Sequence, residues 1–202
     1  MSTFEQDLNK EHLLGKFLDE IYEKLSLNFI RISEPELQNK GVDVIIEHRG
    51  RKFYIDEKAQ LDYLGNSLPT FTFELSYLKN NRWKKGWLYD ENKITDHYFL
   101  ITDIFLNTDK IENGFKSCSI TSVNAKKLRA YLEKTGLDWE LLSNLDGEIR
   151  QSDQQKNIPL HSLKEREEGC LYFSVQKDEK PLNLKLYIKW LIKIKVAKKI
   201  YP

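Results

Sequence analysis

The stretch GVDVIIEHRGRKFYIDEKAQ, residues 41–60, contains two β-rich runs joined by a glycine-containing turn. This pattern predicts a β-hairpin. If Arg49 and Gly50 are the two loop residues, counting outward from the turn places Asp43 directly opposite Asp56. Asp43 itself interrupts an apolar run, so we expect it to face a pocket rather than bulk solvent.

Side chains of a strand alternate between the two faces of its sheet. In the second run, Asp56, Lys58 and Gln60 therefore share one face. The other face is apolar apart from Glu57, which we expect to be structural or to lie at an edge. The alternative for Asp56 and Lys58 is an ordinary solvated hairpin face.

Two carboxylates at directly paired positions need a cation between them. Directly opposed Cβ atoms are about 4.5–5.5 Å apart, so Asp43 and Asp56 would repel each other. Mg²⁺ prefers oxygen ligands from one or two carboxylates together with phosphate and water. Lys58 would be close enough to orient a water or to stabilise charge on a phosphate. The stretch therefore predicts a metal site that acts on phosphate.

The N-terminal residues have helical spacing, which predicts a helix over about residues 4–25. Glu11 falls in its apolar stripe, between Leu8 and Leu14. A carboxylate buried without a partner is costly. We therefore expect Glu11 to point toward Asp43.

Taken together, these residues resemble the PD-(D/E)XK nuclease superfamily. Its hallmark is an acid at the start of one strand and acid-x-Lys on the next, matched here by Asp43 and by 56–58, Asp-Glu-Lys. The family often adds a Glu from the first helix, matched by Glu11, and sometimes a Gln just after the Lys, matched by Gln60. Val42 stands where the family's motif has Pro, a change that the family tolerates widely.

The resemblance covers roughly residues 4–105 and implies an α/β (α+β) restriction-endonuclease-like core, with a central mixed β-sheet flanked by helices and a C-terminal elaboration. It implies Mg²⁺ or Mn²⁺ held by Asp43 and Asp56, with Glu11 close by, and a catalytic set completed by Lys58 and Gln60. The implied substrate is nucleic acid, DNA rather than RNA, and a homodimer is allowed.

The rest of the chain gives coarser expectations. Strands are predicted at 70–78, 96–105 and 170–176, and helices at 124–136 and 138–145. Residues 146–167 are polar and are the best candidate for a linker or mobile loop. The tail from Leu184 has strand alternation, and we expect a strand that breaks or turns into a helix. We expect a single domain over 1–202, with its motif-bearing core at about 4–122.

The segment from Asn80 to Trp87 is basic and aromatic, and we expect a loop there. Such a mixture suits phosphate contact and base stacking. We therefore predict that Arg82, Lys84 and Lys85 contact phosphates. The alternative is a solvated loop whose tryptophans pack into the core.

Composition excludes several classes. With 202 residues, 40% apolar and 31% charged, the chain fits one globular domain, and its net charge of +1 is neutral evidence about nucleic acid. Two cysteines give no disulfide framework, which suits the cytoplasm. The N-terminus is no signal peptide, and no apolar run is long enough for a membrane span. A nucleic-acid-binding or assembly module with a decayed site, and a structural protein, stay open as alternatives.

Overall fold

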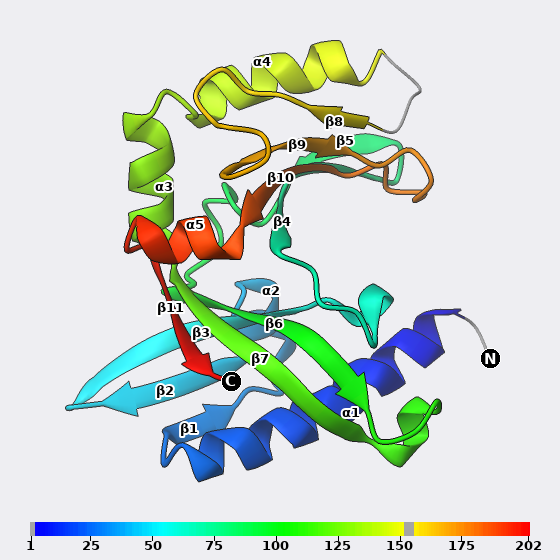
Figure 1. The fold of residues 1–202 in the computed structure, drawn as a ribbon, viewed down its shortest axis with the longest axis vertical. Helices are drawn as coiled ribbons and strands as arrows, with labels where there is room; N and C mark the ends of the chain where they lie inside the picture. Colours follow the sequence, from blue (N-terminus) through cyan, green and yellow to red (C-terminus); the bar gives the residue numbers. More distant parts are fainter. Residues whose placement is uncertain (1–2, 152–155) are drawn as a thin grey trace. The chain divides into compact units, whose positions relative to one another are not determined.

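The computed structural model describes residues 3–151 and 156–202, which form an α+β protein with two sheets (Figure 1). The chain divides into two compact units, where the sequence predicts a single domain over 1–202. The first unit comprises Met1–Leu68, Thr95–Ser122 and Lys199–Pro202, and the second comprises Pro69–Ile94 and Val123–Lys198. The hairpin of residues 41–60 lies wholly within the first unit.

Eleven strands and five α-helices are present in the described residues. The six-stranded sheet has the order β1 (Asn28–Arg31), β2 (Val44–His48), β3 (Arg51–Ala59), β6 (His97–Leu106), β7 (Phe115–Asn124) and β11 (Ala197–Tyr201). The five-stranded sheet has the order β5 (Arg82–Lys85), β4 (Thr70–Lys79), β10 (Leu182–Tyr187), β9 (Gly169–Phe173) and β8 (Lys156–Ile158). The helices are α1 (Thr3–Lys24), α2 (Pro35–Asn39), α3 (Ala125–Lys134), α4 (Trp139–Ile149) and α5 (Ile188–Lys193).

The β2–β3 hairpin has the predicted turn and register. Arg49 and Gly50 both have positive φ, 53° and 73°, as a two-residue type I′ turn requires. The register from His48–Arg51 to Val44–Ile55 is the one obtained by counting from the turn, which confirms that part of the prediction. Asp43 lies just beyond this ladder, where its N–H donates to the Ile55 carbonyl, and its carboxylate interacts electrostatically with that of Asp56.

Strand β3 lies inside the sheet, between β2 and β6. It pairs antiparallel with β2 and parallel with β6, where Asp56 is opposite Tyr98. The sheet is therefore mixed, and Asp56 has neighbouring strands on both sides. That position explains why the Asp56 side chain is buried.

Helix α1 packs against the six-stranded sheet and confirms the helix predicted over 4–25 (Figure 1). Its buried side chains recur at helical spacing: Leu14, Leu18, Ile21 and Tyr22. They share a core with apolar residues of the sheet, among them Val44, Ile55, Phe99 and Ile120. This packing fixes α1 on the sheet face opposite the Asp56 side chain.

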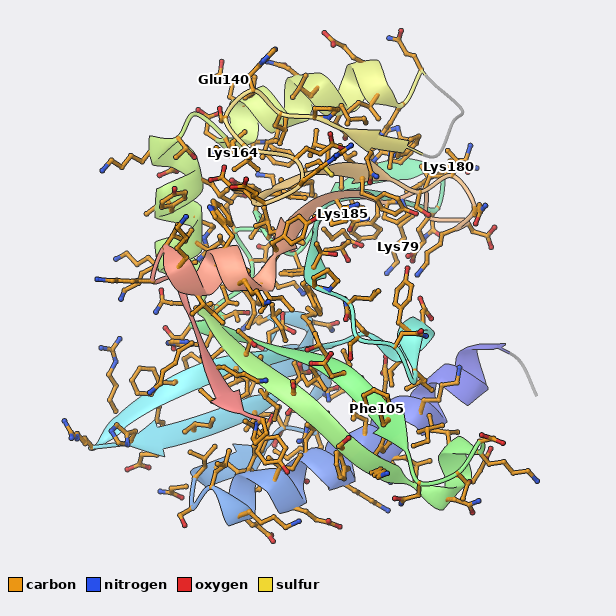
Figure 2. The ribbon with its side chains drawn as sticks, in the orientation of Figure 1. Lys79, Phe105, Glu140, Lys164, Lys180 and Lys185 are labelled. Carbon is orange, nitrogen blue, oxygen red and sulfur yellow. The ribbon has the colours of Figure 1, made fainter. Side chains whose placement is uncertain are left out.

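The second unit is built on the antiparallel five-stranded sheet. In β10 the alternating leucines Leu182, Leu184 and Leu186 are buried, and helix α5 follows directly. The expectation of a strand that turns into a helix is therefore confirmed for the tail. The side chains of this unit include Lys79 at the end of β4 and Lys185 on β10, both labelled in Figure 2.

Two expectations about irregular segments need correction. Residues 80–87 are not a loop throughout, because Arg82–Lys85 form β5, joined to β4 by Asn80 and Asn81, which both have positive φ. The stretch 146–167, expected to be a linker or mobile loop, includes the end of α4 and strand β8, and its residues 152–155 lie outside the described residues.

Among the residues that the structure describes, no helix has the length and apolar character needed to cross a membrane. Cys118 and Cys170 are both buried free thiols.

Candidate active site on the β2–β3 hairpin

Asp43 directly precedes β2, and its backbone forms hydrogen bonds with Ile55 and Ile32. Its N–H donates to the carbonyl of Ile55 at 2.8 Å, and its carbonyl accepts from the N–H of Ile32 at 2.8 Å. Its side chain is half-buried, and its Oδ2 accepts a hydrogen bond of 2.8 Å from the backbone N–H of Glu57. The carboxylate is therefore fixed against β3 next to Asp56.

Asp56 is the most buried acid of the site, with 1% of its surface exposed. Its Oδ1 forms an ion pair of 2.7 Å with Lys58 Nζ, and the Lys58 side chain is 30% exposed. Its Oδ2 is buried and has no hydrogen-bond partner within residues 3–151 and 156–202. A buried carboxylate oxygen without a hydrogen-bond partner is costly, because burial in a protein removes it from bulk water.

The negative charge of Asp56 affects the pKa of Asp43. The pKa of Asp43 is raised to about 6, first by burial and then by the negative charge of Asp56. The Glu57 N–H and the Lys58 charge act in the opposite direction without cancelling the rise. The site is thus short of positive charge, which a divalent cation would supply. Two carboxylates, one of them with a bare oxygen, fit such an ion.

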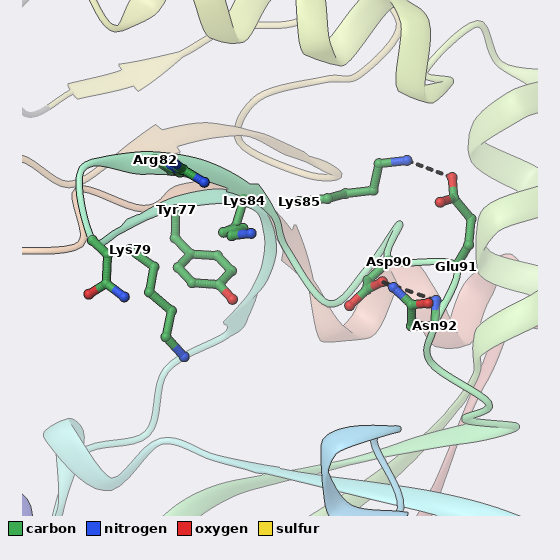
Figure 3. A pocket seen from close by; sticks show the side chains of 9 residues that line it. Tyr77, Lys79, Arg82, Lys84, Lys85, Asp90, Glu91 and Asn92 are labelled. Carbon is green, nitrogen blue, oxygen red and sulfur yellow. Dashed lines mark hydrogen bonds and ion pairs between the residues drawn. The ribbon is translucent and has the colours of Figure 1, made fainter. Parts of the chain in front are cut away.

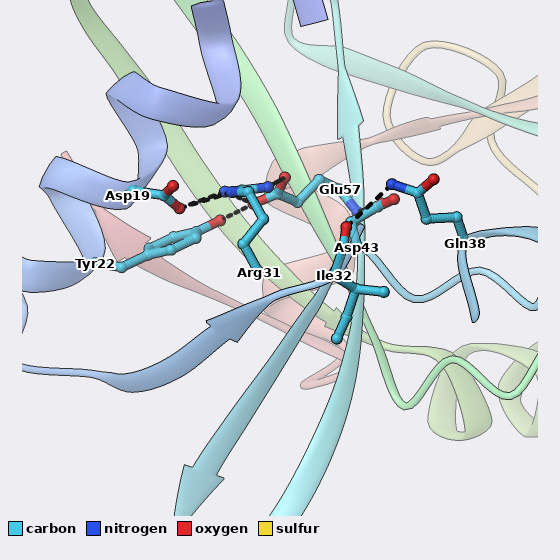
Figure 4. Close-up of polar contacts among 7 residues, drawn as sticks. All are labelled: Asp19, Tyr22, Arg31, Ile32, Gln38, Asp43 and Glu57. Atoms are coloured by element: carbon cyan, nitrogen blue, oxygen red, sulfur yellow. Dashed lines mark hydrogen bonds and ion pairs between the residues drawn. The ribbon is translucent and has the colours of Figure 1, made fainter. Parts of the chain in front are cut away.

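The opposite face of β3 carries a second charged cluster, which contains Glu57 (Figure 4). Arg31 donates from Nη1 to Glu57 Oε2 at 2.8 Å and from Nη2 to Oε1 at 3.2 Å. Arg31 Nε also donates to Asp19 of α1 at 2.8 Å, and the Tyr22 hydroxyl donates to Glu57 Oε1 at 2.5 Å. Each Glu57 oxygen therefore has a partner, and Glu57 is structural, as predicted.

The pKa values in this cluster follow from burial and pairing. Burial acts to lower the pKa of Arg31, but hydrogen bonds to Glu57 and Asp19 outweigh it and raise the value. Burial, and then the charge of Glu57, raises the pKa of Tyr22. Arg31 and Tyr22 therefore keep their protons at neutral pH and hold Glu57 in place. Because the Glu57 N–H binds Asp43, the cluster also positions the Asp43 carboxylate.

Sequence reasoning missed this supporting cluster. Asp19 and Tyr22 come from α1, Arg31 comes from β1, and Glu57 comes from β3. The members of the cluster are therefore far apart in the sequence. Glu57 carried one usable signal, because an acid on an otherwise apolar strand face needs a cation. No feature of the sequence identified Arg31 as that cation.

Of the two remaining predicted site residues, Gln60 fits the site better than Glu11. Gln60 follows the end of β3, where its backbone N–H donates to the Ile101 carbonyl at 3.1 Å, and its side-chain oxygen is buried. Glu11 is exposed, so the expectation that it is buried in the apolar stripe is wrong. Among the described side chains of α1, the fully buried stripe begins one turn later, at Leu14.

The three predicted nucleic-acid-binding cations lie in the second unit, on β5. Arg82 and Lys84 are exposed, whereas Lys85 is half-buried. Lys85 forms an ion pair of 2.6 Å with Glu91, and its Nζ lies 4.5 Å from the ring centre of Trp139. Lys85 therefore differs from Arg82 and Lys84, because it is half-buried and its charge is neutralised by Glu91.

In the part of the chain that the structure describes, no group of three or more His, Cys, Asp or Glu side chains could hold a metal ion. The candidate site thus offers two carboxylates, not three. Comparison with models of protein families, with curated proteins and with solved structures found no match. The functional argument therefore depends on the geometry of this site.

Proposed function

We propose that the chain is a metal-dependent nuclease that hydrolyses phosphodiester bonds of nucleic acid, DNA in the first place, through Asp43, Asp56 and Lys58. The observation that carries the proposal is the pair of buried Asp56 and half-buried Asp43, whose negative charge a single lysine offsets incompletely. Two adjacent carboxylates with one cation suit a site that binds a divalent ion and a phosphate together.

The order of elements supports the same proposal at the level of the fold. Helix α1 precedes the β2–β3 hairpin, and β6 returns parallel to β3 in a mixed sheet. This order is consistent with a restriction-endonuclease-like core and with the PD-(D/E)XK pattern that the sequence resembles. We include this fold assignment in the proposal.

Each residue has a defined part in the proposed reaction. Asp43 and Asp56 would hold Mg²⁺ or Mn²⁺, whose chemistry when bound is to polarise the phosphate and neutralise its charge. Asp56 orients the Lys58 amine through its 2.7 Å contact. Lys58 donates a hydrogen bond to the attacking water or to a phosphate oxygen, where negative charge develops. The Glu57 N–H keeps Asp43 in place.

The alternative is a nucleic-acid-binding or assembly module with a decayed site. One observation favours it, namely that no third acidic or histidine ligand joins Asp43 and Asp56 among the described residues. Mg²⁺ often uses only one or two carboxylates, however, and takes its other ligands from water and phosphate. A two-carboxylate site is therefore compatible with the proposed activity.

A cleavage assay tests the proposal. Linear, nicked, branched and single-stranded DNA are incubated with the full chain and Mg²⁺ or Mn²⁺, using the wild type, Asp56→Asn and Lys58→Ala. Both substitutions should lower the cleavage rate by about a hundredfold or more, because Asp56→Asn removes a ligand of the metal ion and Lys58→Ala removes a cation that stabilises the transition state. Glu23→Gln, at an exposed position of α1, is the matched control and should cut normally. A wild type that cuts no substrate, or variants that cut equally well, would contradict the proposal.

A further inference from the structure

The β4–β5 hairpin of the second unit has two chemically different faces. Its register pairs Tyr77 with Lys84 and Lys79 with Arg82, so these four side chains share one face. The other face carries Trp83 and Lys85, whose side chains contact α4 and the residue that follows it. Arg150 lies 3.6 Å above the Trp83 ring centre, and Lys85 lies over Trp139. The packed face therefore fixes the hairpin and turns the other face outward.

The outward face has an excess of positive charge. Lys79, Arg82 and Lys84 are all exposed, and none of them forms an ion pair with a carboxylate among the described residues. Lys79 lies directly opposite Arg82, and like charges at directly opposed positions destabilise a sheet. Lys79 and Arg82 therefore repel each other in the hairpin, and an anionic ligand would relieve this repulsion.

The same face borders a cavity of about 880 Å³ (Figure 3). Its far wall is the segment Asp90–Asn92. Glu91 there is neutralised by Lys85, and Asp90 Oδ1 accepts hydrogen bonds from the N–H and the Nδ2 of Asn92 at 3.0 and 2.9 Å. Within the described chain, the cavity thus presents three cations that form no ion pair against one such carboxylate, Asp90.

We infer that Lys79, Arg82 and Lys84 form a subsite for the phosphodiester backbone of a nucleic acid, with Tyr77 beside them to stack on a base or donate to a phosphate. Successive cross-strand pairs on one face are about 6.6 Å apart along the strand. Lys79 and Arg82 form one such pair and Lys84 lies in the next, beside Tyr77, so the cations are spread over two pairs rather than gathered at one point. Cations spread in this way beside an aromatic ring suit a charged polymer with bases. The inference rests on the proposed function, because action on nucleic acid makes this backbone the ligand.

The subsite differs from the set that the sequence predicted. Lys85 drops out, because Glu91 neutralises its charge although its side chain also lines the cavity. Lys79 takes its place, contributed by the neighbouring strand β4. The sequence could not indicate this exchange, because it predicts a loop over residues 80–87, and a loop has no alternating faces.

The test measures DNA binding by fluorescence anisotropy in EDTA, over a range of salt concentrations, with short labelled single-stranded and duplex DNA. The wild type is compared with the triple variant Lys79→Ala, Arg82→Ala, Lys84→Ala. Each lost phosphate contact should lower the slope of log affinity against log salt by about 0.7 to 0.9, hence by about two to three in total. The affinity at moderate salt should fall by about a hundredfold.

A matched control removes the same charge elsewhere on the second unit. Lys126, Lys127 and Lys198 are exposed and lie outside the cavity, and their triple alanine variant should keep the wild-type slope. Circular dichroism and a thermal melt of both variants check that the fold is retained. Lys79→Arg with Lys84→Arg preserves the charge and should bind like the wild type.

The outcomes separate this inference from the proposed nuclease activity. Equal losses in the hairpin and control variants, or no loss in the hairpin variant, would overturn the subsite, as would a wild type that binds no DNA. Loss confined to the hairpin variant supports it. If that loss is seen but the wild type cuts nothing with Mg²⁺ or Mn²⁺, the subsite stands and the nuclease proposal fails. If the wild type cleaves DNA but the hairpin variant binds DNA normally, the nuclease proposal stands and the subsite fails.

Discussion

Asp19 and Glu57 share Arg31 on one face of β3, and Asp43 and Asp56 share Lys58 at the other. Each cluster contains two carboxylates and one cation. In the first, the Arg31 guanidinium bonds both acids, and each Glu57 oxygen has a partner. In the second, Asp56 Oδ2 has no hydrogen-bond partner among the described residues, and the pKa of Asp43 is raised to about 6.

The difference between the clusters is one of geometry rather than of charge count. A planar guanidinium presents several donors and can satisfy two carboxylates at once, whereas a lysine amine is a compact point charge. The Arg31 cluster therefore stabilises the chain in its present form. The Asp43–Asp56 cluster leaves negative charge to be neutralised by something else, which is the property expected of a binding site.

Breaking the Arg31 cluster should have the largest effect on stability. Arg31→Ala leaves Glu57 buried without its cation, and removing one partner of a buried pair costs about 3 kcal/mol. Urea denaturation followed by circular dichroism measures the loss. If Arg31→Ala unfolds at the wild-type urea concentration, Glu57 does not depend on this ion pair.

Relieving the Asp43–Asp56 repulsion should have a smaller and opposite effect. Because the pKa of Asp43 is raised in the folded state, the folded chain holds this proton more tightly than the unfolded chain. The corresponding stability is complete below the ordinary pKa of Asp43, near 4, and is lost as the pH rises through about 6. Asp43→Asn should therefore stabilise the metal-free chain at pH 8 by on the order of 1 kcal/mol.

The measurement for Asp43→Asn is a series of urea denaturations from pH 4 to pH 8 in EDTA. The wild type should lose stability across this interval relative to the variant. Two curves that stay parallel would show that Asp43 does not carry the raised pKa. Added Mn²⁺ should reverse the order of stability at pH 8, because a bound ion stabilises the folded wild type.

Asp19→Asn should have the smallest effect and sharpens the comparison within the Arg31 cluster. The Asp19 side chain is 30% exposed, against 12% for Glu57. Its ion pair is more solvated and is expected to contribute only about 0.5 kcal/mol. A loss as large as that of Arg31→Ala would show that α1 is held to the sheet chiefly by this contact.

The hairpin could be predicted because the residues that determine its turn and register are close together in the sequence. The two-residue turn at Arg49-Gly50 sets the register, and the alternation of faces then places Asp56 and Lys58 together. The alternating leucines of β10 were visible for the same reason. The depth to which Asp56 is buried depends on its parallel neighbour β6, however, and that pairing spans an insertion that the sequence pattern does not reveal.

The errors came from features that only tertiary structure decides. Glu11 has the right helical spacing, but burial of the described α1 side chains begins at Leu14, so spacing alone misplaced the acid. The β5 strand is short and mostly charged, and the residues before it, Asn80 and Asn81, form a two-residue turn that the sequence pattern did not predict. Arg31 was missed because its partners are brought to it by the packing of α1 on the sheet.

Calorimetric titration with Mn²⁺ tests the central claim most directly, because it asks whether the incompletely neutralised cluster binds a cation. The wild type should bind Mn²⁺ at the Asp43–Asp56 pair, and Asp56→Asn should lose this binding because it removes the charge of the buried ligand. Lys58→Ala should retain it, since Lys58 acts on water and phosphate. A wild type that binds no Mn²⁺, or an Asp56→Asn variant that binds it equally well, would contradict the account.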